Sequence, residues 1–203
     1  SCLLLLKKVN DKERDGKNSF KSIKESLPDA WNRLEKLNEN KGGLRGIPTG
    51  FDELDQYLSG LQPSDLIILA ARPSVGKTTL ALDIARQASL KFNFPTVIFS
   101  LEMSTQQLVD RMLAAESRVN AWNLRTGHLS TENDFSKIRD SLDRLSKAPI
   151  FIDDMAGNSI IRMRSICRRI KAEHGLGLIV VDYLQLISTS KNYYNMVNQV
   201  TEI

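Results

Sequence analysis

The stretch "LIILAARPSVGKTTLALDIA", residues 66–85, decides the fold of this 203-residue chain. It begins with an unbroken apolar run over residues 66–71, which is typical of a strand buried on both faces of a parallel sheet. A short loop follows, and Gly76, Lys77 and Thr78 stand at its end. After the loop, apolar side chains repeat at helical spacing, at Leu80, Ala81, Ile84 and Ala85. The stretch therefore predicts a strand, a tight loop and a helix in direct succession.

From Ala71 onward the spacing is A-x-x-x-x-G-K-T, the phosphate-binding loop pattern with alanine in place of its first glycine. Gly76 lets backbone N–H groups approach a phosphate, and the helix that starts there presents its positive end. Lys77 can reach terminal phosphates, and the Thr78 hydroxyl can bind Mg²⁺. Because Ala71 carries a Cβ, we expect a negative φ there. A chance G-K-T in an ordinary strand, turn and helix is the alternative. The residues predicted to contact the nucleotide are Arg72, Pro73, Ser74, Val75, Gly76, Lys77, Thr78 and Thr79.

Acidic residues stand where two further apolar runs end, and nucleotide sites in open α/β sheets form at the carboxyl ends of strands. Asp182 follows four apolar residues and can bind or orient the magnesium ion; a helix cap or a turn is its alternative use. Glu102 closes a neighbouring run, so we expect it in the same crevice, as the general base that deprotonates the attacking water. A solvated acid ahead of a helix cap is the competing interpretation. Asp153 and Asp154 follow a third run and are the rival pair for the base.

Strand patterns and helix patterns alternate along the chain. Ser104 and Gln107 form a capping box that opens one helix, and another helix begins at Ser159 and stops at Gly175. This alternation predicts an α/β fold with a mostly parallel sheet flanked by helices. The expected strands are residues 66–71, 96–101, 149–153 and 178–182.

Composition divides the chain into three parts. We expect residues 1–28 to be a flexible N-terminal segment, because residues 7–26 are mostly polar and the apolar run at 2–6 is far too short to span a membrane. Residues 29–43 predict an amphipathic helix followed by a glycine hinge. Such a helix has no core of its own, so we expect it to dock on this domain or on a neighbouring copy. Residues 44–203 form the main domain.

The overall composition is that of a soluble globular chain. Hydrophobic residues make up 41% of it, enough for a sizeable core, and the net charge of +4 permits a polyanionic partner without demanding one. Cys2 and Cys167 fit neither a disulfide framework nor the spacing of a metal site, which favours a reducing cytosol.

The stretches "TGFDELD", "AARPSVGKTTLALDIA", "FSLEMSTQQLVDRMLAAESRV" and "LIVVDYLQLI" carry a family resemblance. Together they resemble the ATPase domain of replicative DNA helicases of the DnaB type, within the RecA-like ATPases. The resemblance covers residues 19–187, and SLEM with DYLQL is more specific than the phosphate loop alone. It implies a RecA-like P-loop NTPase core preceded by a linker helix. It also implies a motor that couples ATP hydrolysis, with Mg²⁺, to translocation on single-stranded DNA and to unwinding during DNA replication.

Residue by residue, the resemblance implies that Lys77 and Thr78 hold the phosphates and the magnesium ion. Glu102 becomes the catalytic glutamate and Asp182 the aspartate on the magnesium side. Arg111, on the helix after Glu102, would lie beside the nucleotide, although a helix arginine is more often solvated.

The resemblance also implies an assembly. The helix in residues 29–43 resembles the linker that docks on an adjacent subunit of a hexameric ring around single-stranded DNA, in the cytoplasm at the nucleoid, with primase and a helicase loader as further partners. Gln185 would be a sensor that couples the nucleotide to the DNA side, with a packed amide as the alternative. Lys191, with Tyr193 and Tyr194, would lie in a channel loop that binds DNA. The basic residues of one helix are interpreted as a solvated face. They are Arg162, Arg164, Arg168, Arg169 and Lys171.

The sequence departs from the family pattern at both ends. Residues 1–18 match nothing, and Met196 and Gln199 stand where the family usually has arginine and glutamate. The chain ends at Ile203, ahead of the family's later sensor glutamine, its arginine finger and most of its DNA-contacting loops, so we expect a fragment of a longer protein. Two other functions stay open: another RecA-like or KaiC-like ATPase, and a nucleotide-binding assembly module without hydrolysis.

Overall fold

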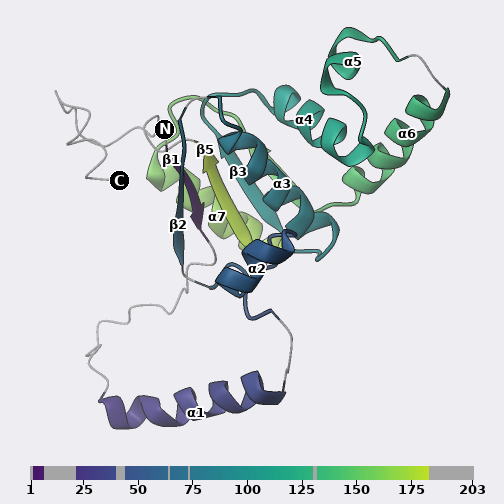
Figure 1. Ribbon diagram of the computed structural model, residues 1–203. Coiled ribbons are helices and arrows are strands. Elements are labelled where there is room, and N and C mark those ends of the chain that lie inside the picture. Colours follow the sequence, from purple (N-terminus) through teal and green to yellow (C-terminus); the bar gives the residue numbers. More distant parts are fainter. Residues whose placement is uncertain are drawn as a thin grey trace.

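A computed structural model describes residues 2–6, 22–39, 44–63, 65–72, 74–129 and 132–182 (Figure 1). The strands are β1 (Cys2–Leu6), β2 (Leu66–Ala70), β3 (Thr96–Ser100), β4 (Ile150–Asp153) and β5 (Leu178–Asp182). The helices are α1 (Ile23–Glu39), α2 (Asp52–Leu58), α3 (Lys77–Leu90), α4 (Thr105–Ser117), α5 (Ala121–Thr126), α6 (Glu132–Ser146) and α7 (Ile160–His174).

The strands form one sheet in the order β2-β1-β5-β3-β4. β3 pairs in parallel with both β4 and β5. β1 is antiparallel to β2 on one side and to β5 on the other, so β2 runs in the same direction as the other three strands. Figure 1 shows α3 on one face of the sheet and α7 on the other. The predicted α/β fold, with a mostly parallel sheet flanked by helices, is confirmed.

Alternate residues of the central strands face two separate cores, as the two-residue period of a strand requires. In β3, Ile98 packs with the buried residues of α3 and α4, whereas Val97 and Phe99 pack with those of α7. The same alternation in β5 places Val180 in the first core and Val181 in the second. Because both faces are covered, every residue of β3 and β5 is buried, as their apolar runs predict.

The N-terminal part differs from the prediction in two places. Within the segment expected to be flexible, residues 2–6 form β1, which pairs along both of its edges. A short leucine run can therefore form an interior strand between two others. Local sequence patterns could not reveal this, because β1 pairs with strands that are far away in sequence. Helix α1 starts at Ile23, six residues before the expected start at Asp29, and contains Pro28. The glycine hinge lies outside the described residues.

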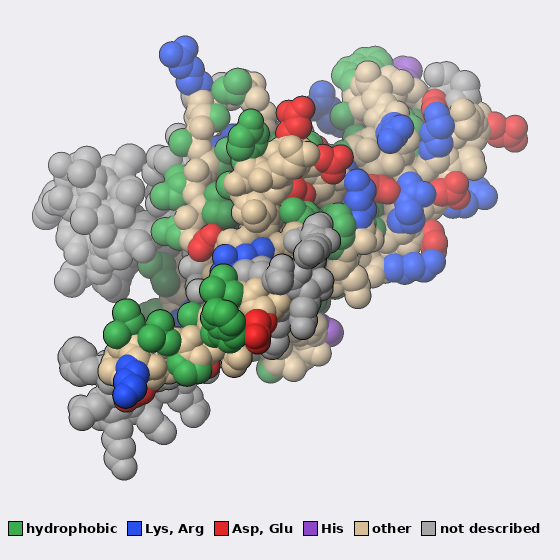
Figure 2. All heavy atoms as spheres, turned by 60° about the horizontal axis from the view of Figure 1, so that its bottom comes forward, with side chains coloured by type: hydrophobic (Ala, Val, Ile, Leu, Met, Phe, Trp, Pro, Cys, Tyr) green, Lys and Arg blue, Asp and Glu red, His purple; other side chains and the backbone are tan. Residues whose placement is uncertain are grey.

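Helix α1 has an exposed apolar face. Figure 1 shows it set apart from the sheet, and Figure 2 shows hydrophobic side chains gathered along it. Four large hydrophobic side chains of this helix are described as more than half exposed: Ile23, Leu27, Trp31 and Leu34. Within the described part of the chain this apolar face is not buried, and its docking on this domain or on a neighbouring copy stays a prediction.

The prediction that β2 is buried on both faces is wrong. Leu66 and Ile68 are 57% and 56% exposed, whereas Ile67 and Leu69 pack against the first core. The reason is that Leu66 and Ile68 lie on the face opposite the first core, and the described core on that face, beside α7, includes no residue of β2, which lies at the edge of the described sheet. An apolar run alone does not distinguish an edge strand from a central one.

Candidate nucleotide-binding site

The loop after β2 has an unusual backbone at two positions. Gly76 is the N-cap of α3 and has a φ of 95°, in the left-handed region that glycine tolerates best. Ser74 also has a positive φ, of 64°, which a residue with a Cβ adopts at a cost. Ala71 is not among the residues with positive φ, as expected. No side chain caps the N-terminus of α3, so its first N–H groups are available to an anion.

Lys77 and Thr78, in the first turn of α3, both contact Asp182 at the end of β5. The Thr78 hydroxyl donates a hydrogen bond of 2.7 Å to Oδ2 of Asp182. The Lys77 ammonium lies 3.2 Å from Oδ1, and the two side chains are only 8% and 4% exposed. Two residues 104 positions apart in sequence thus place a hydroxyl and a carboxylate together. This pair of hard oxygen donors fits Mg²⁺, which takes few protein ligands and completes its shell with water and phosphate.

Glu102 is held in place by its neighbours in the short connection between β3 and α4. The Ser100 hydroxyl donates to the carbonyl of Met103 at 2.6 Å and accepts from the Met103 N–H at 3.1 Å, which fixes both ends of the turn. The Leu101 N–H donates to the Asp182 carbonyl at 2.7 Å. The Glu102 carboxylate itself is exposed and, in the described part of the chain, has no hydrogen-bond or ion-pair partner.

These elements border one cleft of about 810 Å³. The lining residues are Arg72, Ser74, Gly76, Lys77, Thr78, Thr79, Glu102, Met103, Gln107 and Arg111. Three cations and one carboxylate among them favour a polyanionic ligand. Asp182 lies just beneath this cleft and reaches it through Lys77 and Thr78. Val75, which we predicted to contact the nucleotide, does not line the cleft, and Pro73 lies outside the described residues.

The rival carboxylates lie elsewhere. Asp153 accepts hydrogen bonds from the Met155 N–H and the Asn158 amide, both at 3.0 Å. Asp154 accepts one of 2.6 Å from the Thr105 N–H, and this bond lowers the pKa of its carboxyl. Neither residue lines the cleft. The geometry therefore favours Glu102 over this pair.

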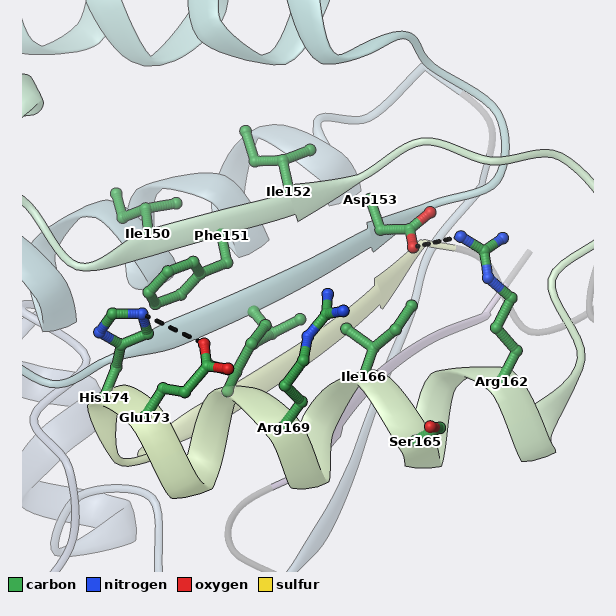
Figure 3. A pocket seen from close by; sticks show the side chains of 12 residues that line it. Ile150, Phe151, Ile152, Asp153, Arg162, Ser165, Ile166, Arg169, Glu173 and His174 are labelled. Carbon is green, nitrogen blue, oxygen red and sulfur yellow. Dashed lines mark hydrogen bonds and ion pairs between the residues drawn. The ribbon is translucent and has the colours of Figure 1, made fainter.

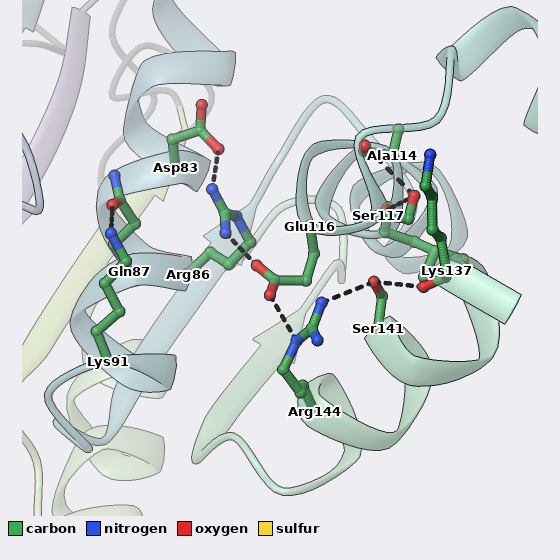
Figure 4. Close-up of polar contacts among 11 residues, drawn as sticks. Asp83, Arg86, Gln87, Lys91, Ala114, Glu116, Ser117, Lys137, Ser141 and Arg144 are labelled. Atoms are coloured by element: carbon green, nitrogen blue, oxygen red, sulfur yellow. Dashed lines mark hydrogen bonds and ion pairs between the residues drawn. The ribbon is translucent and has the colours of Figure 1, made fainter. Parts of the chain in front are cut away.

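A network of charged side chains ties α4 to its neighbours (Figure 4). Glu116 of α4 forms an ion pair with Arg86 of α3 and accepts a hydrogen bond of 2.8 Å from Arg144 of α6. Arg86 also contacts Asp83 on its own helix, at 3.1 Å. Because α4 carries Arg111, this network fixes the arginine side of the cleft relative to the phosphate loop.

Two features of the cleft were not found from sequence. The expected capping box forms between Ser104 and Gln107, but Gln107 also lines the cleft. The second feature is the role of Ser100, whose hydroxyl holds the turn that carries Glu102. Its one weak signal in the sequence is a hydroxyl at the end of an apolar run. The predicted sensor Gln185 and the DNA-binding Lys191 lie outside the described residues.

Comparisons with known proteins agree with this geometry. Residues 46–203 match the family described as "DnaB-like helicase C terminal domain". Over 192 residues the chain is 50% identical to "Replicative DNA helicase DnaB" of Geobacillus stearothermophilus and 48% identical to "Replicative DNA helicase DnaC" of Bacillus subtilis (strain 168). Each match covers 94% of this chain but 42% of the relative, so the chain spans less than half of their length.

Two solved structures resemble the fold. One, described as an "ATPase Domain", superposes with a TM-score of 0.77 and 28% identity, covering 91% of this chain and 64% of that one. "The Structure Of A DnaB-Like Replicative Helicase And Its Interactions With Primase" gives a TM-score of 0.74 and 28% identity, covering 91% of this chain and 44% of that one. None of the helices in the described ranges has both the length and the hydropathy that a membrane span requires.

Proposed function

Because this chain belongs to the family of DnaB-like helicase C-terminal domains, we propose that it is the ATPase motor of a replicative DNA helicase. It binds ATP in the cleft above α3 and uses hydrolysis to drive translocation on single-stranded DNA and unwinding of the duplex. One observation supports this above all others: the phosphate loop and Glu102, which follow two different strands, line one cleft, and Asp182 at the end of a third strand contacts that loop's Lys77 and Thr78.

In the proposed reaction, the uncapped N-terminus of α3 and the side chain of Lys77 receive the terminal phosphates. To do so, Lys77 exchanges part of its contact with Asp182 for the phosphate oxygens. Glu102 accepts a proton from a water molecule, whose oxygen attacks the γ-phosphorus while the bond to the leaving ADP oxygen breaks. Arg111 lies on the cleft wall where it can bind phosphate oxygens. The free carboxylate of Glu102 suits this task, because it has no donor to displace in the described part of the chain.

Thr78 and Asp182 are the residues that would hold Mg²⁺, through the hydroxyl and the carboxylate that lie 2.7 Å apart. When bound, the ion neutralises charge on the β- and γ-phosphates. Asp182 is almost fully buried and its carbonyl accepts a hydrogen bond from the Leu101 N–H, so it can orient a ligand with little reorganisation.

The test is ATP turnover with and without single-stranded DNA. We expect DNA to stimulate turnover, Lys77→Ala to abolish binding or hydrolysis, and Glu102→Gln to keep binding while lowering turnover by about 10²–10⁴-fold. Glu132→Gln, at an exposed glutamate of α6, is the matched control and should turn over normally. Normal turnover in Glu102→Gln would return the base role to Asp153 or Asp154. Nucleotide binding without any turnover in the unaltered chain would support the assembly module instead.

The proposal extends to assembly and partners. The exposed apolar face of α1 supports docking on a neighbouring copy in a hexameric ring. A primase is a proposed partner because one similar structure is described with its primase interactions, and a helicase loader is a further proposed partner. The proposed site of action is the nucleoid, in the cytoplasm.

A further inference from the structure

A groove separate from the nucleotide cleft lies between β4 and α7, at the edge of the sheet farthest from β2 (Figure 3). Its volume is about 660 Å³. Within the described part of the chain, β4 pairs only with β3, so its other edge carries no strand. The groove borders this free edge and shares no lining residue with the nucleotide cleft.

The backbone of β4 offers hydrogen-bonding groups at its free edge. Thr96 donates to the carbonyl of Pro149, so the groups of Ile150 point the other way, since successive residues of a strand alternate. The Ile150 N–H is occupied by the carbonyl of Ala148 at 2.8 Å. By the same alternation, the N–H and C=O of Ile152 face outward, and no strand of the described chain pairs with them. Such an edge is a template on which an extended segment can add as a strand.

The groove also holds a cation that has no acceptor among the described residues. Figure 3 shows Arg169 rising from α7 into the groove, toward β4. Arg162 is paired with Asp153 at 3.4 Å, and Glu173 lies 3.7 Å from His174. In the residues that the structure describes, Arg169 has no hydrogen bond or ion pair. The middle of the groove therefore favours an anionic group.

The wall beside Arg169 is apolar. Phe151 of β4 stacks on the ring of His174, with centroids 4.9 Å apart, and Ile166 of α7 lies between the charged positions. A ligand of this groove thus meets backbone amide groups, an apolar wall and one central cation. An extended peptide with an acidic residue among apolar ones satisfies all three.

We propose that the β4–α7 groove binds an extended segment of a partner protein, which adds as a strand to the free edge of β4 and places a carboxylate against Arg169. A second copy of this chain fits less well, because symmetric pairing of two β4 edges brings the two Arg169 side chains toward each other. A nucleic acid would use the cation but leave the amide edge of Ile152 unpaired. The proposal is independent of the reaction in the nucleotide cleft.

The test uses a library of random 12-residue peptides selected on the intact chain, followed by affinities from fluorescence anisotropy. Arg169→Glu is the perturbation. Arg168→Glu is the matched control, since it makes the same charge change on the same helix at an exposed position outside the groove. We expect the selected peptides to alternate apolar and acidic residues. Arg169→Glu should weaken them by about tenfold or more, as loss of a charge-assisted hydrogen bond predicts, and Arg168→Glu should leave them unchanged.

Two further readouts separate binding from folding. A selected peptide whose acidic residue is replaced by lysine should regain affinity for Arg169→Glu, which a misfolded variant would not allow. Amide hydrogen exchange at Ile152 should slow when the peptide binds. The proposal is overturned by the absence of any selected peptide, by equal losses in both variants, or by unchanged exchange at Ile152. It is equally overturned if Arg169→Glu loses affinity for a single-stranded oligonucleotide and keeps its affinity for the peptides.

Discussion

The buried pair of Lys77 and Asp182 makes the ligand-free site energetically dependent on both partners. We consider Lys77→Met, Asp182→Asn and the double variant, all without nucleotide. Each single substitution leaves one charged group in a nearly closed environment, because the two side chains are 8% and 4% exposed. The double substitution removes both charges at once. The comparison therefore measures how strongly the two charges depend on each other.

The expected size follows from the geometry. Opposite unit charges 3.2 Å apart attract by about 5 kcal/mol at an effective dielectric constant of about 20. Desolvation offsets much of this, yet removing one partner of a buried pair typically costs about 3–5 kcal/mol, because the other charge stays buried. Lys77→Met should lie at the low end, since Asp182 keeps the hydrogen bond from Thr78. The double variant should be no less stable than either single one, so the coupling free energy should equal or exceed the larger single cost, which is at least about 3 kcal/mol.

Urea unfolding of the four proteins measures these free energies. Lys147 and Asp143 provide the control cycle, because their 2.6 Å ion pair joins side chains that are 72% and 63% exposed. Its coupling should be below about 0.5 kcal/mol, as for other exposed pairs at this helical spacing. If the effects of Lys77→Met and Asp182→Asn simply add in the double variant, the two charges do not interact in solution and the reasoning is refuted.

Three further predictions concern Asp154, Cys167 and Glu116, none of which lines the nucleotide cleft or the β4–α7 groove. The Asp154 carboxyl has a pKa lowered from 3.8 by its bond to the first N–H of α4, so its stabilising contribution is present above that value and disappears as the pH falls through the lowered pKa. Urea midpoints of Asp154→Asn should therefore fall below the unaltered protein at pH 7 and converge with it in acid; a constant gap would contradict this. Burial raises the pKa of the Cys167 thiol to about 11. With the other cysteine replaced by serine, Cys167 should react with a thiol reagent at pH 8 on the order of a hundredfold more slowly than a free thiol, and unfolding should abolish the difference. Glu116→Gln should destabilise the chain by about 2 kcal/mol, because it removes the charge that two arginines share. Arg144→Ala, at the half-exposed end, should cost under about 1 kcal/mol in the same unfolding assay; equal losses would contradict the assignment of the stronger ion pair to Glu116 and Arg86.

The features predicted correctly from the sequence are those that depend on residues close together in the chain. The apolar runs of β3 and β5 and the capping box at Ser104 depend on neighbouring residues, and the structure places them as predicted. The positive φ at Gly76 is local in the same sense. What sequence reasoning missed depends on contacts between distant segments. Neither the position of β2 at a sheet edge nor the insertion of residues 2–6 beside it can be read from one strand's composition.

The candidate site shows the same division. Lys77 and Thr78 were identified because a motif fixes their spacing, and their contact with Asp182 follows from the rule that strand ends meet at one edge. The sequence predicted only a capping role for Gln107, yet this residue also lines the cleft. Its place there depends on the direction of α4 relative to the phosphate loop, which local patterns do not reveal. Val75 was expected to contact the nucleotide because it belongs to the loop; it does not line the cleft, and its contact with the nucleotide stays a prediction.

The two carboxylates at the C-terminal end of β4 explain why the positions of strand ends alone could not identify the general base. Asp153 is the last residue of β4 and Asp154 follows it, and the two carboxylates have partners on different helices: Asp153 contacts Arg162 of α7, and Asp154 accepts from the N–H of Thr105 in α4. Each already accepts hydrogen bonds that a water molecule would have to displace, and the bond from the Thr105 N–H also lowers the pKa of the Asp154 carboxyl. Glu102 lies in the connection that follows β3, has no such donor in the described part of the chain, and lines the cleft with the phosphate loop. Three acids share one sequence signature, and their hydrogen-bond partners decide which of them is available for the proposed chemistry.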